Sequence, residues 1–169
     1  FLTPIRNQIF GVDNDNLVDI KDITTRVVVA PAQGLKALTL AEYFKVNTVI
    51  VYDYNPLALE LQKLIFGVTV PTLYQEVMTQ FKEKFPDANV LKGWEEDEYS
   101  VIVPLKNVIV EFRQVDAFSF EIEDLIKSID HRETAVFDFS DIFVYPYNYY
   151  KRGTRQVQGL FAEIYSLIK

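Results

Sequence analysis

The sequence predicts an α/β domain with a mainly parallel sheet, and three observations support this fold class. Two short runs, RVVVA at 26–30 and VIVY at 49–52, have the β-branched, apolar composition of strands that are buried on both faces. A turn and an amphipathic helical pattern follow each run. Strands that alternate with helices through short connections form right-handed parallel crossovers. The length of 169 residues suits a single domain.

The first two helices have clear sequence signals. Apolar residues recur at spacings of three and four over 35–46, which predicts a helix that packs on the sheet. The second strand ends at Asp53, and Asn55-Pro56 then marks a helix start, because asparagine is a favoured N-cap residue and proline suits the first helical position. This helix should continue to about Phe66 and stop at Gly67.

The rest of the chain completes the predicted core. The remaining expected elements are a helix over 72–85 with Thr72 as its cap, an edge strand or strand end over 100–105 limited by Pro104, a third core strand over 108–115, a helix over 121–129, a fourth strand over 135–139 and a closing helix over 155–168. Residues 1–25 are expected to cap the sheet, and residues 26–169 to form the α/β core of the same domain.

Composition narrows the classes of function. The chain has no cysteine and a single histidine, His131, which argues against disulfides, thiol nucleophiles and the common transition-metal sites, so no metal ligand is predicted. The net charge of −7 and the scattered basic residues give no strong signal for nucleic-acid binding. No apolar run approaches the roughly 18 to 20 residues of a membrane span, and the first residues lack signal-peptide features. We therefore expect a cytoplasmic protein that does not enter a membrane.

Polar or small residues follow the carboxyl end of each expected core strand. They are Ala32-Gln33-Gly34, Asp53-Tyr54, Asp116-Ala117 and Ser140-Asp141. Open parallel sheets bind ligands at this edge, where the strand order reverses and the loops diverge. A carboxylate after the second strand can accept hydrogen bonds from both hydroxyls of a ribose. Each aspartate also has a simpler interpretation, since an aspartate after a strand often caps the following turn.

This order of parts resembles the class I S-adenosylmethionine-dependent methyltransferases, whose fold is a Rossmann-like three-layer sandwich with a mainly parallel, seven-stranded sheet. VVVAPAQG lies where the family has its glycine-rich first motif, and VYDYN matches the acidic end of the second strand. QVDAF is similar to the segment that contacts adenine, and FDFSDIF lies where the family holds the reactive methyl group. With four core strands, the expected fold is a truncated form of the family's.

The resemblance implies a cofactor and a set of binding residues. S-adenosylmethionine would be bound by the residues at the strand ends, which are Ala32, Gln33, Gly34, Asp53, Tyr54, Asp116, Ala117 and Ser140. The resemblance further implies that Asp141 or Tyr145 orients or deprotonates the methyl acceptor, whose identity the sequence does not reveal. The first motif contains one glycine where the family has two or three.

Two other functions are consistent with the same fold. A domain that has lost cofactor binding could act as an interaction or assembly module, and the tyrosine-rich segment VYPYNYYKRG at 144–153 could form the interface of a homo-oligomer. The same tyrosines could instead stack on a planar substrate. Binding of an NAD-type dinucleotide is disfavoured, because its phosphates need a glycine-rich turn at a helix start.

Overall fold

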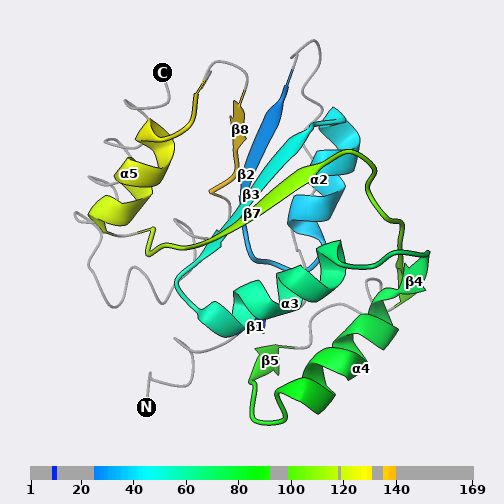
Figure 1. Ribbon diagram of the computed structural model, residues 1–169. Helices are drawn as coiled ribbons and strands as arrows, with labels where there is room; N and C mark the ends of the chain where they lie inside the picture. The colour runs from blue at the N-terminus through cyan, green and yellow to red at the C-terminus, as the bar shows by residue number, and fades with distance from the viewer. Residues whose placement is uncertain (1–8, 11–24, 92–98, 118, 131–134, 140–169) are drawn as a thin grey trace.

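A computed structural model shows an α/β fold built on a four-stranded, fully parallel sheet (Figure 1). The structure describes residues 9–10, 25–91, 99–117, 119–130 and 135–139. In this sheet the strand order is β7-β3-β2-β8. The four strands are β2 (Val27–Pro31), β3 (Thr48–Asp53), β7 (Ile109–Gln114) and β8 (Ala135–Phe137). The fold is therefore Rossmann-like and truncated, as the sequence predicted.

The two central strands are buried on both faces, which explains their unbroken apolar runs. Their register pairs Val28 with Val49 and Ala30 with Val51, and these four side chains belong to one core cluster. The alternate residues, which include Val29, belong to a second cluster on the other face. Because side chains in a strand alternate between faces, a strand with helices on both sides needs apolar residues at every position.

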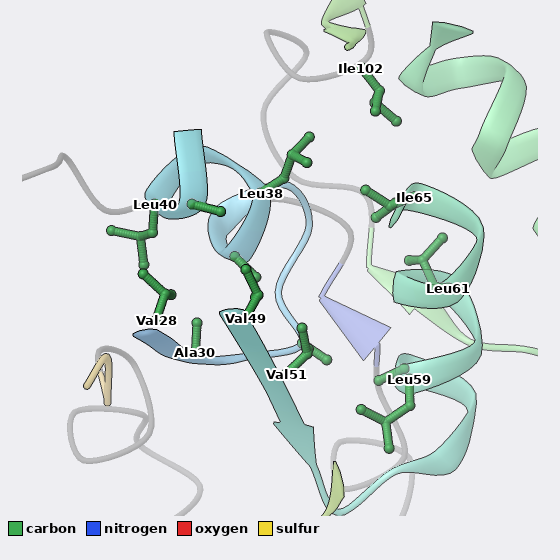
Figure 2. Packing of buried hydrophobic residues seen from close by; sticks show 14 of the residues in the cluster. Val28, Ala30, Leu38, Leu40, Val49, Val51, Leu59, Leu61, Ile65 and Ile102 are labelled. Atoms are coloured by element: carbon green, nitrogen blue, oxygen red, sulfur yellow. The ribbon is translucent and has the colours of Figure 1, made fainter. Parts of the chain in front are cut away.

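Helices cover both faces of the sheet and make three layers. Helices α2 (Lys36–Phe44) and α3 (Pro56–Phe66) pack on one face, and α5 (Phe120–Lys127) packs on the other. Figure 1 shows α5 and α2 on opposite sides of the strands. Figure 2 shows the larger cluster, in which leucines of α2 and α3 lie against the valines of the central strands.

One predicted helix begins differently from the expectation. Thr72 is not an N-cap, because Thr72–Leu73 forms a short strand, β4, that pairs antiparallel with β6 (Val101–Ile102). Helix α4 therefore runs over Tyr74–Lys84, and the N–H of Tyr74 donates to the carbonyl of Ser100 at 2.8 Å. Pairing with a distant segment has overridden the local capping signal. The predicted edge strand over 100–105 consequently belongs to this two-stranded ribbon and not to the main sheet.

Other expectations lie wholly or largely outside the described residues. Of residues 1–25, only Thr25 and β1 (Ile9–Phe10) are described, and β1 pairs in parallel with β5 (Val90–Leu91). His131 and the closing helix predicted over 155–168 fall outside this part of the chain. Among the helices that the structure describes, none combines the length and apolar character needed to cross a membrane.

Both ends of α3 follow the sequence signals. The Asn55 side chain accepts a hydrogen bond from the N–H of Leu57 at 3.0 Å, and Pro56 occupies the first turn. At the other end, a Cβ atom on Gly67 would lie 2.7 Å from the carbonyl oxygen of Lys63. A carbon and an oxygen atom that are not bonded cannot lie this close together unless the backbone shifts. Glycine is therefore required at position 67 for steric reasons.

Gly67→Ala should lower the free energy of unfolding by about 1–2 kcal/mol, because the added methyl group must displace the Lys63 carbonyl. Urea denaturation measures this change. Thr69→Ala, at an exposed neighbouring position, is the control and should have little effect. Equal stability of the glycine and alanine proteins would contradict the steric explanation.

Candidate functional site

The strand order creates a point of divergence at the carboxyl edge of the sheet. From β2 through α2 to β3, and through α3 to β7, the chain moves in one direction across the sheet. Strand β8 then pairs with the opposite side of β2, and α5, which precedes it, lies on the other face. The loop after β2 therefore leads to a helix on one face, whereas the connection from β7 back to β8 runs through α5 on the other face. This is the arrangement in which open α/β sheets form a ligand crevice.

The loop after β2 is held tightly in place. The N–H of Ala32 donates to the carbonyl of Tyr52 at 3.0 Å, which extends the β2–β3 ladder by one residue and brings Ala32 level with Asp53. Gln33 follows and is 5% exposed. Gly34 has φ of 45°, in the left-handed region that favours glycine. Its carbonyl oxygen accepts a hydrogen bond from Nε2 of Gln62 at 2.8 Å. The single glycine of this loop is thus required by backbone conformation.

Gln62 anchors this loop from α3 and is itself buried, with 1% of its surface exposed. Its second amide atom, Oε1, has no hydrogen-bond partner within the described ranges. A buried polar side chain is costly unless it is hydrogen-bonded, so the bond to Gly34 is the observed compensation for placing an amide among the apolar residues of α3.

Asp53 closes β3 and combines two roles at this edge. One of its carboxylate oxygens, Oδ1, accepts a hydrogen bond from the N–H of Asn55 at 2.8 Å, so it caps the turn before α3. Burial raises the pKa of Asp53 to about 7, although hydrogen bonds from the N–H groups of Asn55 and Tyr54 act in the opposite direction. Near neutral pH, Asp53 is therefore a mixture of protonated and ionised forms.

Tyr54, the next residue, is 40% exposed, and its carbonyl accepts a hydrogen bond from Nε2 of Gln114 at 3.2 Å. This contact ties the loop after β3 to the neighbouring strand β7. The side chain of Tyr54 is thus accessible at the same edge as Asp53.

Asp116 lies two residues beyond the end of β7 and takes part in the start of α5. Its N–H donates to Oε2 of Glu121 at 3.0 Å, and its carbonyl accepts from the hydroxyl of Ser119 at 2.9 Å. Ser119 in turn caps α5 by accepting from the N–H of Glu121. The backbone of Asp116 therefore belongs to a helix cap. Ala117 beside it is 7% exposed.

The register brings some of the predicted residues together. Ala32 lies level with Asp53, and the N–H of Val115 donates to the carbonyl of Asp53 at 3.0 Å, which places Asp116 next along that edge. Asp53 thus stands between the loop after β2 and the segment after β7. The other predicted residues, Ser140, Asp141 and Tyr145, lie outside the residues that the structure describes.

The sequence analysis missed a buried charged pair at the divergence point. Lys36, in the first turn of α2, has its Nζ 3.5 Å from Oδ2 of Asp138 and 3.2 Å from Oε1 of Gln33. The side chain of Lys36 is 4% exposed and that of Asp138 is 15% exposed. Each residue had a sequence signal of its own, a lysine at the start of an otherwise apolar helix face and an aspartate between two phenylalanines at a strand end, but neither signal indicated the other residue as its partner.

Tyr52 fixes the backbone on which Asp138 sits. Its hydroxyl donates to the carbonyl oxygen of Asp138 at 2.8 Å, and the N–H of Asp138 donates to the carbonyl of Val29 at 2.8 Å. Burial and then the nearby charges of Asp138 and Asp53 raise the pKa of Tyr52 well above its ordinary value. The hydroxyl therefore remains a proton donor throughout the neutral range, and Asp138 is held from two neighbouring strands.

Comparisons with known proteins give no relative for this chain. No protein-family model, no curated protein and no solved structure matches it. Within the described part of the chain, no group of three or more histidine, cysteine, aspartate or glutamate side chains is arranged to hold a metal ion.

Proposed function

We propose that this domain binds S-adenosylmethionine at the carboxyl edge of its sheet and acts as a methyltransferase-like protein. The observation that carries the proposal is the strand order β7-β3-β2-β8, because it sets a divergence point between β2 and β8 and places Asp53 one strand away from it. A carboxylate in that position suits the two hydroxyls of a ribose. The methyl acceptor is not specified by this argument.

Asp53 would act as the ribose-binding group in its ionised form. A carboxylate accepts hydrogen bonds from hydroxyl donors, and a hydrogen bond to a charged group contributes about 1.5–3 kcal/mol. The neutral form, which is populated because burial raises the pKa to about 7, has weaker acceptor capacity. Binding of an adenosine group should therefore strengthen as the pH rises through the neutral range. Chemistry at the methyl group would depend mainly on how the bound reactants are positioned.

Asp53→Asn should bind S-adenosylhomocysteine at least about tenfold more weakly than the unmodified protein does at about pH 8. Isothermal titration calorimetry measures both affinities. Asparagine keeps an Oδ1 acceptor for the N–H of Asn55, so the turn before α3 is preserved while the charge is removed. The unmodified protein should also bind about tenfold more weakly at pH 6 than at pH 8, because only about one Asp53 in ten is ionised at the lower pH. The variant should lose this pH dependence.

Asp87→Asn is the matched control, because Asp87 is exposed in the turn after α4. It should bind the ligand like the unmodified protein. Equal binding by Asp53→Asn would contradict the role of Asp53.

The rival function is an interaction module without cofactor, and one observation favours it. The Asp53 carboxylate already caps a turn through the N–H of Asn55, which is a sufficient structural reason for an aspartate at this position. An absence of heat with S-adenosylhomocysteine at millimolar concentration would support this rival and overturn the proposed function.

A further inference from the structure

Strand β7 leaves one of its edges open. It stands at the end of the four-stranded sheet and pairs with β3 along its whole length, but within the described residues no strand pairs with its second edge (Figure 1). Proteins often protect such an edge with a bulge or a proline, because its unpaired N–H and C=O groups can accept another strand. The register of β7 is continuous, and VIVEFRQV at 108–115 contains neither proline nor glycine. This edge is therefore suited to strand addition.

The hydrogen bonds to β3 determine which backbone groups of β7 face the open edge. The N–H of Ile109 donates to the carbonyl of Asn47 at 2.8 Å, and the ladder continues in register to the end of β7. Backbone groups of successive residues in a strand point to opposite edges. The odd-numbered residues of β7 therefore bond to β3, whereas Val110, Phe112 and Gln114 direct their N–H and C=O groups to the open edge.

The two charged residues of β7 lie side by side on the face of the sheet away from α3. Arg113 donates from Nε and Nη2 to Oε2 of Glu111, at 3.2 and 3.0 Å. The side chains of Arg113 and Glu111 are 49% and 42% exposed. The alternate residues Val110 and Phe112 pack against the core cluster that contains α3. Charges on an edge strand usually discourage pairing with other strands. A glutamate two residues before an arginine is different, because this order can complement a second copy of itself.

A second copy of β7, antiparallel to the first about a two-fold axis at Phe112, satisfies both the backbone and the charges. Phe112 then faces its own copy, and Val110 faces Gln114 of the second copy, so the outward N–H and C=O groups exchange hydrogen bonds in pairs. In the same register Glu111 lies opposite Arg113 of the second copy, twice by symmetry, and opposite charges across strands are stabilising. Moving the axis by one residue places Glu111 opposite Glu111, or Arg113 opposite Arg113, which is destabilising.

We propose that β7 is the interface of a symmetric dimer, in which the parallel sheets of two copies join through antiparallel β7 strands into one continuous sheet. An interface of one strand pair is small, so the dimer forms reversibly and depends on protein concentration. The contacts involve the edge of β7 and not the carboxyl ends of the strands, so this inference is independent of the proposed function. The surface also differs from the tyrosine-rich segment at 144–153, which lies outside the described residues.

Sedimentation velocity over a concentration series, applied to a set of charge reversals, tests this interface. The unmodified protein should show an equilibrium between monomer and dimer. Glu111→Arg and Arg113→Glu should each weaken dimerisation at least about tenfold, because each places like charges opposite one another at both symmetric positions. An equimolar mixture of these two variants should form a heterodimer, and the double variant Glu111→Arg/Arg113→Glu should form a homodimer. Both arrangements again pair opposite charges across the two strands.

Glu83→Arg makes the same change of charge at an exposed position of α4 and is the matched control, which should dimerise like the unmodified protein. Amide hydrogen exchange at Val110, Phe112 and Gln114 should be slower in the dimer than in Glu111→Arg. A monomer up to millimolar concentration of the unmodified protein would overturn the proposal. A dimer that persists in folded Glu111→Arg would also overturn it and would indicate a different interface, and so would failure of the two single variants to associate when mixed.

Discussion

Lys36→Met should lower the free energy of unfolding by about 3 kcal/mol, because it leaves the carboxylate of Asp138 in a largely buried position without its cation. The carboxylate has little access to water, since the side chain of Asp138 is 15% exposed. Methionine fills much of the volume of the lysine stem, so the loss reflects charge more than packing. Urea denaturation at neutral pH measures the effect.

The double variant Lys36→Met/Asp138→Asn separates charge from shape. Removing both charges should restore most of the lost stability, since a buried ion pair contributes little net free energy compared with neutral groups of similar size. The exposed pair Lys63–Glu60 on α3 serves as control, and Lys63→Met alone should change stability by less than about 1 kcal/mol. Additive losses at Lys36 and Asp138 would show that the two side chains do not interact.

Asp53→Asn should become increasingly more stable than the unmodified protein as the pH rises from about 4 to about 8. The folded protein binds the Asp53 proton with a pKa of about 7, against an ordinary value of 3.8. Between these two values the folded state holds the proton and the unfolded state has lost it, so stability falls as pH rises. Each unit of pKa corresponds to about 1.4 kcal/mol, and the difference should therefore reach about 4 kcal/mol above neutral pH.

Comparing the two proteins at each pH cancels the titration of every other group that they share. The measurement is a series of urea denaturation curves, from which the difference in free energy of unfolding is taken at each pH. Asp87→Asn makes the same chemical change at an exposed position and is the matched control. A constant difference between Asp53→Asn and the unmodified protein would mean that Asp53 ionises as readily in the folded state as in the unfolded one. If the expected trend is found, Asp53→Asn combines greater stability above neutral pH with the weaker ligand binding predicted above. This is the usual relation between stability and function at a functional site.

Local signals predicted most of the elements correctly. The strands over 26–30 and 49–52 and the helix that Asn55 caps were found because their evidence lies within a few residues of each element. Thr72 was misassigned because its partner, Ile102, is far along the chain. No local pattern reveals such a pairing.

The candidate site was only partly predictable for the same reason. Asp53 was identified from its place after a strand, but its raised pKa depends on burial by the whole fold. Lys36 and Asp138 become partners only when β8 pairs with β2, and the sequence did not indicate the side of β2 on which the fourth strand would lie. Strand order is a long-range property, and the pair could be recognised only after it was known.

The pairing of β8 with β2 also has a consequence for how the molecule folds. Strands β2 and β3 join residues that are close along the chain, whereas β8 must return to β2 from far along it. Closing such a long loop is slow, so we expect the local β2-α2-β3-α3 unit to form first and β8 to dock on it late. Asp138 reaches Lys36 only with that docking step. If β8 docks late, weakening the contact between Lys36 and Asp138 should accelerate unfolding more than it slows folding.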